Sequence, residues 1–144
     1  MPEYNRIVAA IDLSDESHLI LQRALRLVGG HRQRLHLVHV CEHPITGYGE
    51  LTGKNHMVTE VQIRQGVYPR LEAIGREFDL PQQNLHIEFG RAADVIHTLA
   101  QTLESDLIVI GSHGKKGLEL LLGSTANSVI HAAKCDVLTV RVRL

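Results

Sequence analysis

The sequence predicts an α/β fold, a single doubly wound, five-stranded parallel sheet with helices on both faces. Short apolar runs alternate with segments of helical spacing along the 144 residues, an order typical of parallel strands joined by crossover helices. Hydrophobic residues make up 44% of the chain although Trp is absent, so Val, Ile, Leu and Ala must form most of the core, as in a buried parallel sheet. The length suits one domain, and we expect residues 1–144 to fold as a single unit.

The first third of the chain predicts a strand, a helix and a second strand. Residues 6–12 (RIVAAID) form a β-branched run that ends at an acid, and residues 14–16 (SDE) predict the cap and acidic first turn of a helix. The helical spacing stops at the glycine pair 29–30, and residues 34–41 (RLHLVHVC) predict the second strand. Residues 42–55 contain one proline and three glycines, which indicates a long loop.

The middle of the chain predicts a helix, a strand and a further helix. Residues 56–79 show helical spacing, and we expect Gly66 and Pro69 to kink or restart this helix. Residues 84–89 (NLHIEF) alternate like a strand, and an apolar stripe over 92–103 predicts the next helix.

The last third completes the sheet. Residues 106–110 (DLIVI) predict a buried fourth strand, and the turn Gly-Ser-His-Gly follows at once. A last helix is expected over 124–133 and a fifth strand over 137–142. We therefore expect a Rossmann-like sheet with the strand order 3-2-1-4-5.

This topology places the candidate site at the ends of the first and fourth strands, because ligands bind beyond the carboxyl ends of such sheets where the strand order reverses. Asp12 ends the first strand, and Gly111 opens the turn after the fourth. Gly111 and Gly114 would let the backbone approach a ligand closely. The turn lacks the spacing of a P-loop, so the P-loop mechanism does not carry over.

Charge assigns a bound anion to the last helix rather than to the first. Residues 123–125 (GST) begin the last helix without an acid, and lysines stand at 115–116 before it. The first helix begins with the acids 15–16, which would repel phosphate. Asp12 would then accept hydrogen bonds from a ribose or a base. A purely structural interpretation stays open, in which the glycines make turns and the hydroxyls cap a helix.

Three segments, IVAAIDLSDES, HLVHV and DLIVIGSHGKKGLELLLGSTANSVIHAAKCDVLTVRV, resemble the universal stress protein family, and the resemblance runs essentially end to end. The last segment is similar to the family's nucleotide motif, which reads Gly, two residues, Gly, nine residues, Gly and Ser or Thr. The second interval here, residues 115–122, has eight residues instead of nine.

The resemblance implies a dimeric regulatory module of the stress response that binds ATP or a related adenine nucleotide, with Mg²⁺ as the accompanying ion. The residues that match the family's pocket are Asp12, Val40, Gly111, His113, Gly114, Gly123, Ser124 and Thr125. Family members closest to universal stress protein A lack the glycines and are thought not to bind ATP. This chain keeps the glycines, while its DLSDES and ITGYGELTG segments look like that branch. The alternative is therefore the same fold without nucleotide, acting as a dimeric protein-interaction module.

The family also implies a homodimer that pairs the last strand across a two-fold axis. The apolar residues 138, 140 and 142 alternate here with Thr139, Arg141 and Arg143, as in an edge strand with one wet face. The alternative is an edge that its arginines keep monomeric. Other protein partners are not identified by the sequence.

Composition argues against several other classes of function. The formal net charge of −1, without a basic run, gives no footprint for nucleic acid. No apolar run approaches the roughly 18 residues of a membrane span, and because residues 1–6 run directly into the first predicted strand, we expect no secretion signal. Cys41 and Cys135 each lie in an apolar stretch and are expected to be reduced thiols, so we expect a cytoplasmic protein.

Neither a metal site nor a catalytic site is predicted. Of the 10 histidines, His36 and His39 lie close together in the sequence but would point to opposite faces of a strand. His113 lies in the glycine turn, where we expect it to contact a ligand or form a hydrogen bond. It is accompanied by no activated nucleophile or paired carboxylate. We therefore expect no catalytic residue, and at most slow hydrolysis of ATP.

Overall fold

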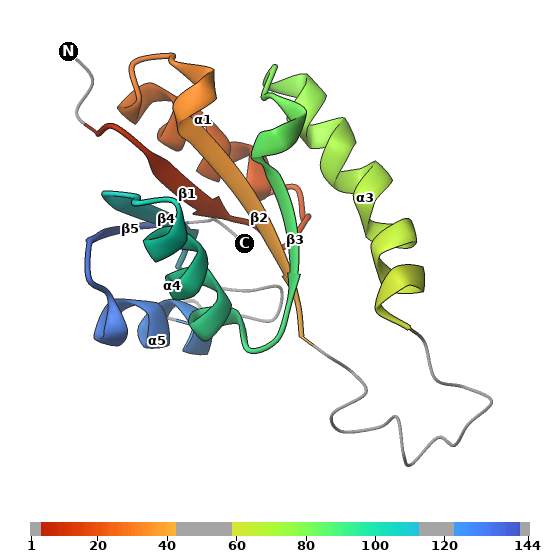
Figure 1. Cartoon of the computed structure of the whole chain (residues 1–144). Helices are drawn as coiled ribbons and strands as arrows, with labels where there is room; N and C mark the ends of the chain where they lie inside the picture. Colours follow the sequence, from red (N-terminus) through yellow and green to blue (C-terminus); the bar gives the residue numbers. More distant parts are fainter. Residues whose placement is uncertain (1–3, 43–58, 113–122, 142–144) are drawn as a thin grey trace.

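The computed structural model describes residues 4–42, 59–112 and 123–141. Within them, one parallel sheet has the order β3-β2-β1-β4-β5 (Figure 1). The strands are β1 (Ile7–Ala10), β2 (Leu35–Cys41), β3 (Leu85–Phe89), β4 (Leu107–Gly111) and β5 (Asp136–Val140). The helices are α1 (Ser17–Leu27), α3 (Glu60–Glu77), α4 (Ala92–Thr102) and α5 (Ser124–Ala132). The expected fold class and strand order are confirmed.

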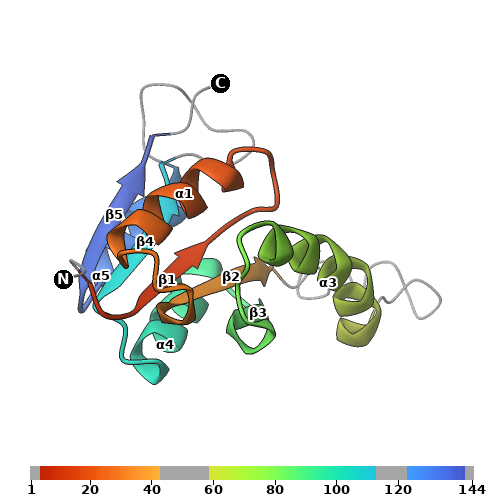
Figure 2. The ribbon, with the colours of Figure 1, turned by 90° about the horizontal axis from the view of Figure 1, so that it is seen from above.

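Helices cover both faces of the sheet (Figure 2). Alternate residues of β1 face opposite layers, because side chains of a strand alternate between its two faces. Ile7 and Ala9 pack in the core with α1 and α3, whereas Val8 and Ala10 pack in the core with α4 and α5. All four are buried, so the central strand is apolar on both sides, as the sequence indicates.

The first helix begins later than expected. Residues 14–16 do not form its first turn but a preceding turn, in which Ser17 N–H donates to the Ser14 carbonyl over 3.0 Å. The chain reverses at Leu13, which is buried and has a left-handed φ of 66°. β1 therefore ends at Ala10, before Asp12, and the first turn of α1 contains no acid.

The helix α3 does not restart at Gly66 or Pro69, so of the two expected alternatives, a kink or a restart, the restart is excluded. The helix runs without interruption from Glu60 to Glu77 with Pro69 inside it. Proline removes the N–H that would bond the carbonyl four residues earlier, at Gln65. Both residues are exposed, so water can satisfy that carbonyl. The helix begins with a capping box between Thr59 and Gln62, whereas the expected start at 56 and the loop from 43 to 55 lie outside the described residues.

Side chains fasten the sheet at the amino ends of its strands. The Asp106 carboxylate, just before β4, accepts the N–H groups of Asn5 and Arg6 over 2.9 Å each. The buried Asn84 side chain, just before β3, donates to the carbonyls of Gln33 and Leu35 over 3.1 and 2.9 Å. These bonds fix the register at one edge and leave the opposite, carboxyl edge to the site.

Within the described ranges, no helix combines the length and the apolar character needed to cross a membrane.

Candidate functional site

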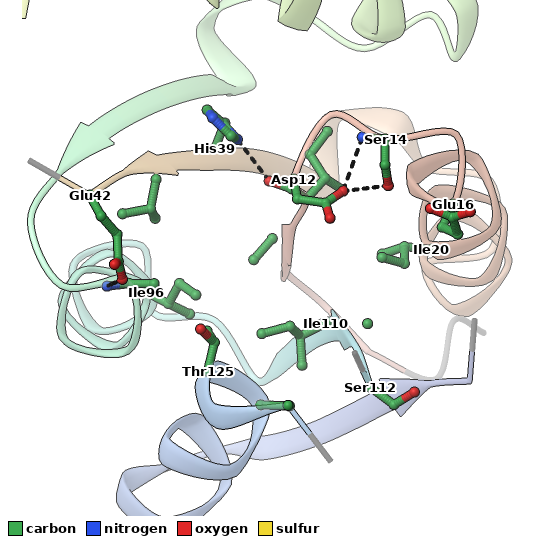
Figure 3. A pocket seen from close by; sticks show the side chains of 17 residues that line it. Asp12, Ser14, Glu16, Ile20, His39, Glu42, Ile96, Ile110, Ser112 and Thr125 are labelled. Atoms are coloured by element: carbon green, nitrogen blue, oxygen red, sulfur yellow. Dashed lines mark hydrogen bonds between the residues drawn. The ribbon is translucent and has the colours of Figure 1, made fainter. Parts of the chain in front are cut away.

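A pocket lies at the carboxyl edge of the sheet, where the strand order reverses between β1 and β4 (Figure 3). Its volume is about 230 Å³, which exceeds the roughly 150 Å³ of a cavity that can hold a benzene-sized ring. Its described wall consists of Ala10, Ile11, Asp12, Ser14, Glu16, Ile20, His39, Val40, Glu42, Ala92, Ile96, Ile110, Gly111, Ser112, Gly123, Thr125 and Ala126. The position is the one expected from topology for a ligand of this class of sheet.

The structure brings most of the predicted residues together. Those on the pocket wall are Asp12, Val40, Gly111, Gly123 and Thr125. Ser124 is the first residue of α5 and stands between two wall residues without lining the pocket itself. His113 and Gly114 lie outside the described residues, as do the two lysines that follow them. That these residues hold a ligand stays a prediction.

Asp12 is held in place by a tight local turn. Its Oδ1 accepts hydrogen bonds from the Ser14 N–H over 3.0 Å and from the Ser14 hydroxyl over 2.5 Å. Such a bond from a residue to the backbone two positions on is the usual way an aspartate closes a turn. In Figure 3 the two side chains meet at the end of β1, above the pocket. The carboxylate is thus oriented before any ligand arrives.

The start of α5 faces the pocket without a capping side chain. Its N-cap is Gly123, which offers no side-chain oxygen, and the first turn of the helix contains no acid. The Gly123 N–H donates to the Ser112 carbonyl over 2.7 Å. The Ser112 N–H in turn donates to the Val140 carbonyl over 2.9 Å. These bonds fix the helix start to β5 and to the end of β4. The free N–H groups of a first turn, with the positive end of the helix dipole, make a position suited to an anion.

Three ionisable residues of the wall were not predicted as ligand contacts. Glu16 ends the turn before α1, His39 lies on β2 with its Nδ1–H donating to the Ile11 carbonyl over 2.9 Å, and Glu42 follows β2. The sequence offered a signal for Glu42 alone, because it stands two positions after Val40 and therefore on the same side of the extended chain. The pairing of Glu42 with α4, 50 residues away, is visible only in the fold.

The charged side chains on the mostly apolar described wall of the pocket are all acidic. They are Asp12, Glu16 and Glu42, and no Lys or Arg is among the described wall residues. If a polyanion binds here, the N-terminus of α5 and a cation would have to offset its electrostatic repulsion from these carboxylates.

Metal ligands do not gather anywhere in the described part of the chain, where no group of three or more His, Cys, Asp or Glu side chains could hold an ion. His36 and His39 face opposite sides of β2, as expected: His36 contacts His86 of β3, and His39 bonds to Ile11.

Comparison with known proteins identifies the family. The family model described as the universal stress protein family matches residues 3–141. Universal stress protein A homolog 1 of Coxiella burnetii is 37% identical over 138 residues, which cover 95% of this chain and 96% of that protein. The solved structure of the hypothetical protein MJ0577 has a TM-score of 0.78 and 24% identity over 99% of each chain. A universal stress protein solved in complex with cAMP has a TM-score of 0.65 and 20% identity, covering 96% of this chain and 98% of that one. At these identities the two structures show the shared fold.

Proposed function

Since the chain belongs to the universal stress protein family, we propose that it is a regulatory module that binds ATP or a related adenine nucleotide at the carboxyl edge of the sheet. The observation that carries the proposal is the uncapped start of α5 beside an apolar pocket. The complex of a structural relative with cAMP supports adenine nucleotides as ligands of this fold.

The residues present fit such a ligand. Val40, Ile96 and Ile110 give the pocket an apolar wall suited to a flat base. Asp12 is positioned to accept hydrogen bonds from a ribose or base, and the first turn of α5 would hold phosphate. Mg²⁺ would offset the charge between the phosphates and the three wall carboxylates. Binding alters the surface that a partner meets, and rapid turnover is not part of the proposal.

Isothermal titration of nucleotide-stripped protein with ATP and Mg²⁺ tests this function. We expect a dissociation constant in the micromolar range, about −8 kcal/mol of binding free energy, and no rapid release of phosphate. Denaturing the purified protein and chromatographing the supernatant shows whether a nucleotide co-purifies. Absence of both heat and co-purified nucleotide would exclude the proposal.

A second candidate function is favoured by the acidic wall. Asp12, Glu16 and Glu42 oppose a polyanion, and a module of the same fold that leaves the pocket empty would act through its protein-binding surfaces alone. The same titration separates the two candidates.

We also propose that two chains pair through β5. This strand is the edge of the sheet next to β4, and three of its residues, Val137, Leu138 and Thr139, are half-buried. A groove beside the strand is lined by Tyr4 and Leu27, and the Tyr4 hydroxyl donates to Asp136 over 2.8 Å. An edge strand offers unpaired backbone groups to a second copy.

A cytoplasmic location belongs to the proposal too. Cys41 and Cys135 are free thiols, and burial raises the pKa of each. Protonated, half-buried thiols suit a reducing compartment.

A further inference from the structure

Three helices begin at the pocket, but their N-termini differ in charge. At α1, the N-cap residue is the acid Glu16. At α4, the Ala92 N–H donates to Glu42 Oε2 over 3.3 Å, and Asp94 adds a second carboxylate in the first turn. At α5, no acid occurs in the first turn. A carboxylate at a helix N-terminus takes the place that a phosphate would otherwise occupy. The phosphates of a nucleotide are therefore directed to α5, and the base to the side of α4.

Glu42 stands at that base side. In an extended chain, residues two positions apart lie on the same face, so Glu42 follows Val40 on the side of β2 that packs toward α4. The Gly90 N–H donates to the Cys41 carbonyl over 3.2 Å, which holds the loop before α4 against the end of β2. Figure 3 shows Glu42 beside Ile96, across the pocket from Asp12 and Ser14. A base packed on the apolar wall would meet the Glu42 carboxylate at its edge.

We propose that Glu42 is a specificity-determining residue of this pocket, whose carboxylate accepts a hydrogen bond from an exocyclic amine on the six-membered ring of the bound base. The inference rests on the proposed nucleotide binding and deepens it. An ionised carboxylate only accepts hydrogen bonds. The Glu42 carboxylate can therefore accept a hydrogen bond from the amine at position 6 of adenine. It forms no such bond with a base that carries hydrogen at that position.

The test compares ATP with purine riboside triphosphate, which replaces the amine at position 6 by hydrogen and leaves the ribose and phosphates unchanged. Dissociation constants are measured by titration calorimetry with Mg²⁺. For the wild-type protein we expect ATP to bind about tenfold more tightly, because hydrogen bonds to charged groups are among the stronger ones. In Glu42→Ala we expect the ratio of the two constants to fall to about one.

The ratio separates recognition of the amine from bulk charge. Removing a carboxylate favours any polyanion, but it does so equally for both triphosphates, so their ratio does not change. Asp94→Ala is the matched control, since Asp94 is also a carboxylate at the N-terminus of α4 but does not line this pocket. We expect it to keep the wild-type ratio. Because Glu42 is exposed, circular dichroism should show both variants folded.

The outcomes are distinguishable. A wild-type ratio near one, or an unchanged ratio in Glu42→Ala, overturns the role of Glu42 and leaves the nucleotide-binding proposal standing. If neither triphosphate binds to the wild-type protein, the proposed function and this inference fail together.

Discussion

Asp12 offers a ligand only part of its hydrogen-bonding capacity, because Ser14 occupies one carboxylate oxygen with two donors. The same turn contains Leu13 at a positive φ, a conformation that a branched side chain adopts at a cost of about 1 kcal/mol or more. Burial of Leu13 in the core with α1 and α3 compensates for that cost. Arg70 of α3 also reaches the Leu13 carbonyl, over 3.4 Å. Packing thus holds Asp12 where a ligand would meet it.

Ser124→Asp tests the assignment of phosphate to α5. A carboxylate at the first position of this helix should repel phosphate and weaken ATP binding about tenfold or more. It should also favour the helix dipole, so the free energy of unfolding should stay constant or rise by about 0.5 kcal/mol. Opposite signs for affinity and stability rule out misfolding as the cause. Ser124→Asn is the neutral control. Equal ATP affinity in the two variants would show that phosphate does not bind at the start of α5.

Between elements, a pair of histidines joins β2 to β3. His36 Nδ1 and His86 Nε2 lie 3.0 Å apart, a distance at which one ring donates and the other accepts. Burial lowers the pKa of both rings, and that of His36 reaches about 4 with contributions from His86 and Arg6. Glu88 opposes the shift at His86. The folded state therefore favours the neutral form of both imidazole rings.

This pair predicts acid sensitivity of the sheet edge. Because the pKa of His36 is lower in the folded state than the ordinary 6.5, the unfolded chain binds a proton first as the pH falls. The stabilisation is complete above pH 6.5 and is lost as the pH falls toward 4. Urea unfolding between pH 7.5 and 4.5 should show a shallower loss for His36→Gln than for wild type. The exposed His31→Gln is the control, and parallel loss in wild type and His36→Gln would contradict the prediction.

Across the whole molecule, the order of elements could be predicted because each strand is either a short apolar run or, as in β3, a run of alternating polar and apolar residues. The central strand β1 is buried on both faces, and a continuous apolar run is the sequence pattern that indicates such a strand. A restart at Pro69, one of the two expected alternatives, does not occur, because exposure of the helix lets water replace the lost bond. Topology predicted where the pocket lies, and Asp12, Gly111 and Gly123 line it, but that they hold a ligand stays a prediction. The partnership of Glu42 with Ala92 escaped prediction, because no local pattern links residues that only the fold brings together.

Dimer formation would make the stability of the molecule depend on its concentration. If β5 pairs with a second copy, sedimentation velocity should give twice the 16.0 kDa chain mass, and the unfolding temperature should rise with protein concentration. Leu138→Lys places a charge on the edge strand, where Leu138 also packs against the core on the side of α1, and should yield a monomer with a lower unfolding temperature. Val61→Lys is the matched control, since Val61 is 63% exposed on α3, far in the topology from β5. A dimer that survives Leu138→Lys must use another surface, and a wild-type monomer at every concentration would leave β5 an unpaired edge.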